Sequence, residues 1–151
     1  MGTSFSEIYD DFMTTVTDYT LITLYTASVS DFETYMSAFL IKAIEDFSLK
    51  CDQDLSYSSS TFSETLSQKN IDMLALLMKQ HWLEKTIDDI KQMNLAITDK
   101  DFRRYAESQN MKEKRERYIL ELEKVSQKLS EYALNYTLDW SAWFSGNYYI
   151  P

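Results

Sequence analysis

The chain is almost without the residues that interrupt regular structure. Its 151 residues include two glycines and one proline, Gly2, Gly146 and Pro151, so neither type occurs between residues 3 and 145. Sheets depend on such residues at their tight turns. Their scarcity argues against a sheet protein and favours long helices. A chain of this length buries about 68 to 70% of its unfolded surface, which is enough for one core.

Reactive and metal-binding residues are also scarce. Cys51 is the only cysteine, which excludes an internal disulfide and a multi-thiolate metal site and is typical of a reducing compartment. His81 is the only histidine, so a bundle metal centre that needs two imidazoles is excluded. The glycines are too few for a phosphate-binding loop. We therefore expect no catalytic residue, no metal site and no cofactor.

The remaining candidates for chemistry have simpler structural interpretations. His81 and Glu84 share a helical face, but we expect a structural histidine beside Trp82. Neighbouring carboxylates occur in three places, at Asp10 and Asp11, Glu45 and Asp46, and Asp88 and Asp89. Adjacent positions on a helix diverge by about 100°, so the two members of a pair do not converge on a substrate. We expect these pairs to lie on solvated helix faces.

No stretch is apolar for long enough to cross a membrane. The longest relevant uncharged run, residues 19–30, has 12 residues and many hydroxyl groups. A membrane-spanning helix needs about 20 apolar residues. The N-terminus also lacks the basic and apolar segments of a signal peptide. We therefore expect no membrane span.

Negative charge dominates but is unevenly distributed. The formal net charge is −9, with all of this excess in residues 1–98, whereas residues 99–117 carry a net charge of +2. Tight binding of duplex DNA requires a concentrated basic face, which this mixture of signs does not supply. An acidic surface can still line a channel for DNA, because like charges let the polymer pass without sticking.

Two amphipathic helices are predicted in the first third of the chain. Ser4 and Glu7 have the spacing of a capping box, and Ser30 and Glu33 repeat it. The apolar stripes that follow are Phe5, Ile8, Tyr9, Phe12, Met13 and Val16, then Phe32, Tyr35, Met36, Phe39, Leu40, Ala43, Ile44 and Phe47. Residues 19–29, between the helices, are compatible with either an extended link or a helical turn.

A polar loop and a buried helix are predicted next. Residues 48–67 are rich in serine and predict the main loop, which Phe62 and Leu66 should pin to the core. A helix follows from a Ser67 cap and ends near Asn94. Its first part has almost no polar face, with Ile71, Met73, Leu74, Ala75, Leu76, Leu77 and Met78 in close succession. This part should form the buried centre of the fold.

The last long helix has the sharpest pattern in the sequence. A heptad seam runs through Met111, Arg115, Tyr118, Leu122, Val125, Leu129, Tyr132 and Tyr136. Residues 111–137 would span roughly 40 Å as a helix. Bulky tyrosines fit a two-stranded coil poorly, so packing in a bundle is favoured over a free coiled-coil dimer. The prediction is an all-α bundle of four to five helices over residues 1–138, followed by a tail of residues 139–151.

Aromatic residues crowd into this C-terminal tail. They are Trp140, Trp143, Phe144, Tyr148 and Tyr149, followed by Ile150. Five aromatic side chains carry on the order of 1000 Å² of surface, more than the few hundred that a monomer usually exposes in one patch. Two interpretations remain open. The tail folds back on its own bundle, or these six residues form a protein interface with a neighbouring subunit or partner.

Several short stretches of the chain resemble those of a known protein family and occur in the same order. They are Glu7-Ile8-Tyr9 with Phe12, Val16-Thr17-Asp18-Tyr19, residues 47–55 with Lys50-Cys51 and Asp54-Leu55, residues 71–83 with Leu74-Ala75-Leu76 and Trp82-Leu83, and residues 101–112 with Tyr105 and Ser108-Gln109-Asn110. In these stretches the chain resembles the helical head-to-tail connector, or adaptor, proteins in the neck of tailed bacteriophages. The resemblance covers most of residues 5–138 and rests on ordinary residues in order, not on a catalytic motif.

The resemblance implies a non-enzymatic structural protein of the virion. It would form a ring of twelve copies beneath the portal, contact the portal protein and the adjoining neck and tail proteins, and meet DNA only as passing cargo. It would be made in the cytoplasm of the bacterial host and would need no membrane. A different interpretation is a small acidic inhibitor, encoded by a phage, that binds a host protein through the aromatic tail. An enzyme is the least favoured class.

Overall fold

The part of the protein that the structure describes consists of helices and one short hairpin. The computed structural model describes residues 1–96 and 102–137, with side chains at 1–89, 109–132 and 134. The described elements are α1 (Phe5–Thr15), α2 (Tyr19–Ala27), α3 (Val29–Phe47), β1 (Tyr57–Ser58), β2 (Thr61–Phe62), α4 (Gln68–Ala96) and α5 (Phe102–Thr137). This confirms the prediction of an all-α bundle of four to five helices. In the described residues, no helix is both long and apolar enough to span a membrane.

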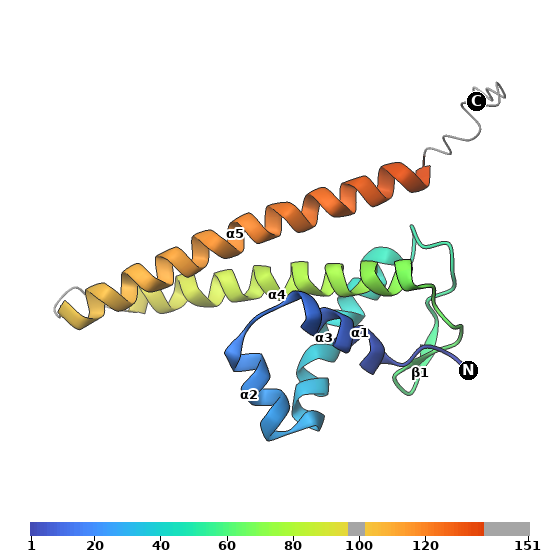
Figure 1. Ribbon diagram of the computed structural model, residues 1–151, viewed down its shortest axis with the longest axis horizontal. Coiled ribbons are helices and arrows are strands. Elements are labelled where there is room, and N and C mark those ends of the chain that lie inside the picture. Colours follow the sequence, from blue (N-terminus) through green and yellow to red (C-terminus); the bar gives the residue numbers. More distant parts are fainter. Residues whose placement is uncertain (97–101, 138–151) are drawn as a thin grey trace.

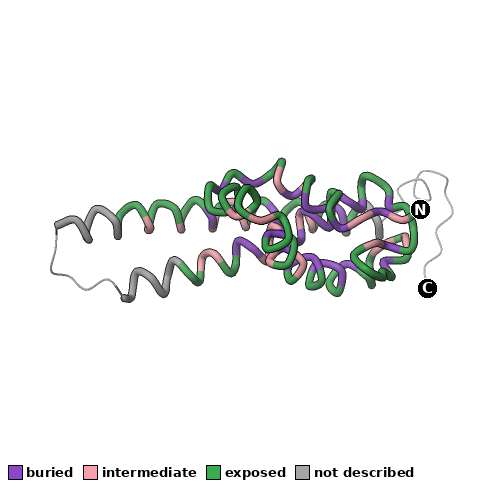
Figure 2. Tube along the Cα trace, turned by 90° about the horizontal axis from the view of Figure 1, so that it is seen from below, coloured by how far each residue is buried: buried purple, intermediate pink, exposed green. Residues whose placement is uncertain are grey.

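Helix α4 is the centre of the bundle. It packs lengthwise against α5 on one side and against α1 and α3 on the other, while α2 packs mainly on α3 (Figure 1). Buried residues gather where α4 lies between these neighbours (Figure 2). The core residues of α4 are Ile71, Met73, Leu74, Ala75, Leu77, Met78, Trp82 and Leu83. The apolar run therefore does mark the centre of the fold, and the helix ends at Ala96, close to the predicted end near Asn94.

The first helix begins where the capping-box spacing places it. The amide of Ser4 donates to the carboxylate of Glu7 at 3.0 Å, and α1 starts at the next residue. This bond satisfies an amide that would otherwise lack a partner at the start of the chain's first helix. The predicted stripe is buried at Phe5, Ile8, Tyr9, Phe12 and Val16, with Met13 partly buried against the core.

The start of α3 differs from the prediction. Ser28, and not Ser30, is the N-cap: its hydroxyl accepts the amide of Asp31 at 3.2 Å. The predicted pair of Ser30 and Glu33 therefore lies within α3, after its start. The apolar stripe itself is confirmed, because Phe32, Met36, Phe39, Leu40, Ala43, Ile44 and Phe47 are all buried.

The serine-rich loop contains a hairpin that the sequence did not predict. Ser59 and Ser60 have φ values of 50° and 59°, the left-handed conformation that a two-residue hairpin turn requires. The N-terminal segment pairs with this hairpin, since Phe62 donates to the carbonyl of Thr3 at 2.8 Å and Phe5 donates to that of Ser60 at 2.9 Å. Phe62 and Leu66 are buried as expected, so they anchor the loop.

The heptad seam of α5 faces α4 of the same chain. Tyr118, Val125 and Tyr132 are buried, and Met111, Leu122 and Leu129 are partly buried against the core. Packing within a bundle, which the tyrosines predicted, is therefore observed. The helix begins at Phe102, nine residues before the predicted Met111. The side chain of Tyr136 lies outside the described residues.

A buried amide joins the loop to both long helices. Asn70, at the start of α4, is fully buried and donates to the side-chain oxygens of Asp52 and Gln53, each at 2.8 Å. Its own side-chain oxygen accepts the hydroxyl of Tyr132 at 3.1 Å. Gln53 also accepts the amide of Ser67, the residue before α4, at 2.7 Å. These bonds hold the end of the loop, the start of α4 and the last turns of α5 together.

Burial of one tyrosine predicts a loss of stability at high pH. Tyr9 packs edge-on against Phe5 and Phe32, and burial, followed by the charge of Glu33, raises the pKa of its phenol to about 12. An unfolded tyrosine has a pKa of about 10. The folded chain therefore holds this proton more tightly than the unfolded chain does. The stabilisation that the Tyr9 phenol contributes is fully present below pH 10 and is lost as the pH rises towards 12.

Tyr9→Phe should remove this part of the pH dependence. We expect urea unfolding to show a steeper fall in the free energy of unfolding between about pH 10 and pH 12 for the wild type than for the variant. Equal slopes in the two proteins would contradict the assignment to Tyr9. Comparison of the two proteins cancels the contributions of other tyrosines, which both share.

Candidate interaction surface

Helix α2 begins at a buried carboxylate. One oxygen of Asp18 accepts the amides of Thr20 at 2.8 Å and Leu21 at 3.2 Å. Asp18 thus satisfies two of the four amides that a helix leaves without a partner at its start. The helix ends at Ala27, and the amide of the next residue, Ser28, donates to the carbonyl of Leu24 at 2.9 Å. Residues 19–29, left open by the sequence, are therefore mainly a helix that runs directly into α3.

Exposed apolar side chains and threonines share the outer surface of α2, which carries no charge. Leu21 is buried against the bundle and Leu24 is half-buried, whereas the exposed fractions are 81% for Tyr19, 43% for Ile22, 46% for Tyr25 and 48% for Val29. No charged residue occurs from residue 19 to residue 30. Exposed apolar groups that form a contiguous patch mark interaction sites more often than isolated ones do. We call these four exposed residues, three on α2 and Val29 at the start of α3, the α2 face.

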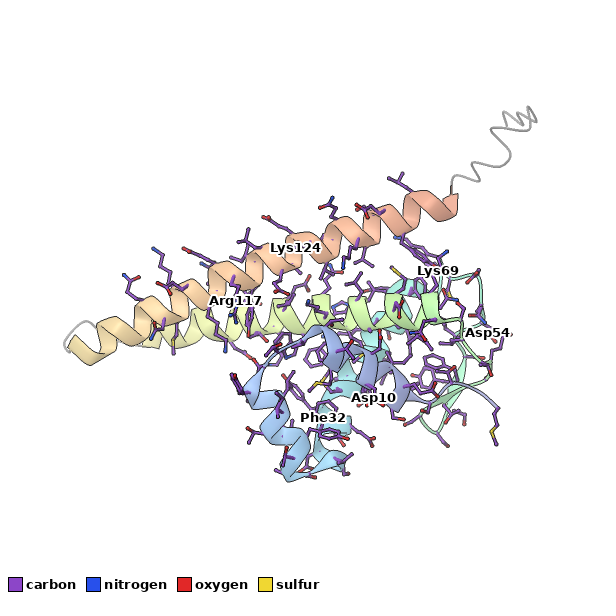
Figure 3. The ribbon with its side chains drawn as sticks, in the orientation of Figure 1. Asp10, Phe32, Asp54, Lys69, Arg117 and Lys124 are labelled. Atoms are coloured by element: carbon purple, nitrogen blue, oxygen red, sulfur yellow. The ribbon has the colours of Figure 1, made fainter. Side chains whose placement is uncertain are left out.

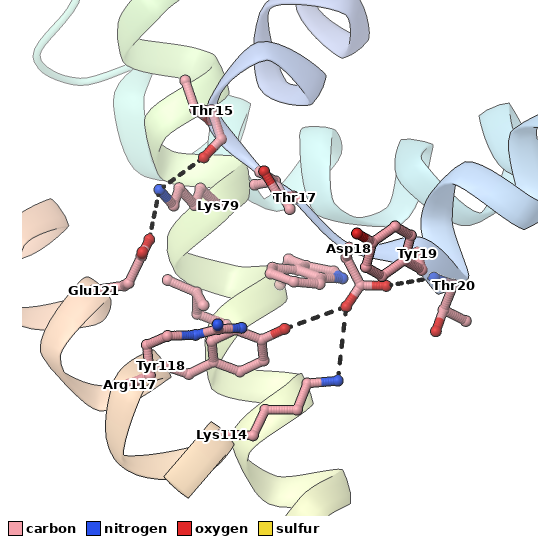
Figure 4. A pocket seen from close by; sticks show the side chains of 13 residues that line it. Thr15, Thr17, Asp18, Tyr19, Thr20, Lys79, Lys114, Arg117, Tyr118 and Glu121 are labelled. Atoms are coloured by element: carbon pink, nitrogen blue, oxygen red, sulfur yellow. Dashed lines mark hydrogen bonds and ion pairs between the residues drawn. The ribbon is translucent and has the colours of Figure 1, made fainter.

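A cleft lies beside the α2 face. It has a volume of about 500 Å³ and is formed by the link between α1 and α2 together with α4 and α5 (Figure 4). Its apolar lining comes from Val16, Trp82 and Leu83, all of which are buried. Tyr19 and Thr20, the first residues of α2, line the cleft as well, so the cleft and the α2 face are continuous.

An ion pair closes one end of the cleft. The ammonium group of Lys79 lies 2.8 Å from the carboxylate of Glu121 and donates to the carbonyl of Thr15 at 3.2 Å. The hydrogen bond from Lys79 lowers the pKa of the Glu121 carboxyl group below its usual range. These bonds fix the distance between α4, α5 and the end of α1, so the cleft is already formed in the isolated chain.

Tyrosine and cations line the other end of the cleft. The hydroxyl of Tyr118 donates to the second oxygen of Asp18 at 3.2 Å, and the ammonium group of Lys114 lies 3.9 Å from the same oxygen. Burial, followed by the negative charge of Asp18, raises the pKa of the Tyr118 phenol. The Tyr118 ring packs against Trp82 with centroids 5.6 Å apart. The structure thus brings together Asp18 and Tyr118, which are far apart in the sequence.

Two exposed cations lie over this tyrosine. The ammonium group of Lys114 is 5.5 Å, and the guanidinium carbon of Arg117 5.4 Å, from the centre of the Tyr118 ring. Arg117 and Lys124 both project from the stretch of α5 that passes along the bundle (Figure 3). Cations in this position attract aromatic faces as well as carboxylates. This end of the cleft therefore presents positive charge beside an aromatic ring.

The histidine considered in the sequence joins two helices. Nε2 of His81 on α4 lies 2.6 Å from the carboxylate of Asp46 on α3, and Nδ1 lies 3.9 Å from Glu84. Within residues 1–89 and 109–134, no cluster of three or more potential metal ligands occurs. The observed contacts of His81 are structural, as the sequence suggested.

One carboxylate pair meets a partner that the sequence did not indicate. Asp10 is exposed, but Asp11 is half-buried and close to Asp72 on α4. Burial, followed by the negative charge of Asp72, raises the pKa of the Asp11 carboxyl group. The members of the other two pairs are exposed. Only the packing of α1 on α4 brings Asp11 and Asp72 together, so helix periodicity alone could not have revealed this contact.

The aromatic residues of the tail lie beyond the region that the structure describes. These are Trp140, Trp143, Phe144, Tyr148, Tyr149 and Ile150, which the sequence proposed as an interface. The α2 face and the cleft were not among the predicted site residues. The signal that could have found α2 is the uncharged stretch of residues 19–30.

Comparison of the chain with known protein families finds no match, and the same holds for comparisons with curated proteins and with solved structures.

Proposed function

We propose that the chain is a structural subunit of the head-to-tail connector of a tailed bacteriophage. In this role it forms a ring beneath the portal, contacts the portal protein and the adjoining neck and tail proteins, and has no catalytic activity. The resemblance to such connectors over most of residues 5–138 supports the assignment. The observation that carries it is the exposed, uncharged α2 face beside a preformed cleft.

The α2 face fits a subunit that works in contact with other chains. An exposed helix of a monomer usually directs charged and polar groups to solvent. Helix α2 contains no charged residue, and Tyr19, Ile22 and Tyr25 remain exposed. A neighbour in a ring would cover these side chains and remove their apolar surface from water. The acidic charge of the chain is compatible with DNA passing through such a ring without being held.

Disruption of the gene that encodes this chain, in the phage that carries that gene, tests the connector function. We expect the host to accumulate filled or emptied heads and separate tails, seen by electron microscopy, with tailed particles restored when the chain is supplied in trans. Quantitative mass spectrometry of purified wild-type particles should find the chain at the copy number of a neck ring. Normal yields of tailed particles without the chain would overturn the proposal and favour the inhibitor interpretation.

A further inference from the structure

We infer that the α2 face and its neighbouring cleft are the docking site for the aromatic C-terminal segment, residues 139–151, of a second copy of this chain. The inference rests on the proposed ring and specifies the contact between its neighbouring subunits. The site is the α2 face with the cleft, and the occupant is the segment that contains Trp140, Trp143 and Phe144.

The chemistry of the site matches that of the segment. The α2 face is apolar and uncharged, and Val16, Trp82 and Leu83 line the cleft beside it. The volume of about 500 Å³ lies within the range of about 300 to 1,000 Å³ of pockets that hold small ligands. The occupant offers five aromatic rings within thirteen residues. Burial of these rings removes apolar surface from water on both partners.

Charge also favours this occupant. Lys114 and Arg117 are exposed cations at the cleft. The lining also includes Lys79 and the carboxylates of Asp18 and Glu121, so it is net positive in a chain whose net charge is −9. Residues 139–151 contain one carboxylate, Asp139, and no lysine or arginine. The aromatic rings of this segment can form cation–π contacts with Lys114 and Arg117, and Asp139 can form an ion pair with them. An acidic segment elsewhere in the chain, without aromatic residues, would offer only the second of these contacts.

Chain geometry favours a second copy over the same chain. Tyr118, at the cleft, lies 19 residues before Thr137, the last described residue of α5. This separation is about 28 Å along a helix. Trp140 and Trp143 follow Thr137 by three and six residues, so a fully extended chain carries them at most about 11 and 22 Å from it. Trp140 therefore cannot return to the cleft of its own chain, and Trp143 could reach only its nearer end, at Glu121, in a fully extended segment.

Such a contact is heterologous, because one surface of the chain meets a different surface of its neighbour. A heterologous contact repeats from copy to copy and closes into a ring when the rotation between neighbours allows it. A symmetric contact between two α2 faces would instead stop at a dimer. The docking of residues 139–151 on the next copy is therefore the arrangement that agrees with a ring.

Two full-length variants test the inference by complementation. The receptor variant, Tyr19→Glu with Ile22→Glu, places charge on the α2 face at exposed positions and should leave the fold intact. The tail variant carries Trp140→Ala, Trp143→Ala and Phe144→Ala. We expect each variant alone to self-associate at least tenfold more weakly than the wild type in analytical ultracentrifugation. An equimolar mixture should form a heterodimer, since each variant keeps the surface that the other has lost.

The control variant carries Ile41→Glu with Leu49→Glu, the same change of charge at exposed apolar residues outside the site. It should assemble as the wild type does, and circular dichroism should show equal helix content in all four proteins. Self-association that survives in the tail variant, or a mixture without heterodimer, would overturn the inference. A wild type that stays monomeric would overturn it as well. The particle experiment decides the connector role separately, because a ring held by other contacts would still appear in the neck.

Discussion

Replacing Phe12 by alanine is expected to lower the free energy of unfolding by about 3 to 5 kcal/mol. Phe12 lies fully buried between α1 and α4, where its ring packs edge-on against Trp82 with centroids 6.1 Å apart. Truncation removes the buried ring and leaves a cavity that the two helices cannot close, because α4 is held by α3 and α5 as well. Equilibrium unfolding in urea, followed by circular dichroism, measures the loss.

Two substitutions serve as controls for this effect. Phe12→Leu keeps most of the buried volume, so its loss should be clearly smaller than that of alanine. Tyr19→Ala removes an aromatic ring that is 81% exposed and should change the free energy of unfolding by no more than about 0.5 kcal/mol. A loss below about 1 kcal/mol for Phe12→Ala would mean that the contact between α1 and α4 is not part of the core.

The helices that the sequence located well are those with a one-sided apolar stripe. The stripe from Phe32 to Phe47 repeats at the period of a helix, and its inward positions are buried because α3 packs on α4 along its length. The same holds for the stripe of α1, whose start is marked by Ser4 and Glu7. Such signals are local, so they are readable without knowledge of the neighbours.

The sequence left α2 open and did not predict the hairpin, because both segments lack those local signals. Only Leu21 of α2 is buried, so no stripe marks the helix, and its cap is an aspartate that precedes a run without charge. Ser28 follows the last residue of α2 and also caps the start of α3, so the spacing of Ser30 and Glu33 was misleading. The hairpin turn uses Ser59 and Ser60 where asparagine or glycine is usual.

The interaction surface could not be predicted for a different reason. It depends on contacts between residues that are far apart in the sequence, such as Asp18 on the link before α2 and Tyr118 on α5. Nothing in the pattern of either segment specifies the other. The aromatic tail was visible in the sequence because its residues are consecutive, whereas the site proposed to receive it is formed only when α1, α2, α4 and α5 are packed.

The same dependence on distant partners makes Asn70 the second sensitive position. Its side chain bonds to Asp52 and Gln53 in the loop and to Tyr132 on α5, so one buried amide connects three parts of the chain. Asn70→Ala removes all three bonds and leaves a small cavity. We expect a loss of about 2 to 4 kcal/mol in the free energy of unfolding, together with faster hydrogen exchange at the amides of the loop.

Tyr132→Phe is the matched variant, because it removes only the hydroxyl that donates to Asn70 and keeps the ring packed against Phe47. Its loss should be about 1 kcal/mol. If the two residues act through their shared bond, the double variant should be less destabilised than the sum of the single variants, since that bond is counted in both. If the losses of the two single variants simply add in the double variant, the loss in Asn70→Ala comes from its bonds to the loop. A loss within about 0.5 kcal/mol for Asn70→Ala would show that the amide does not hold the loop to the helices.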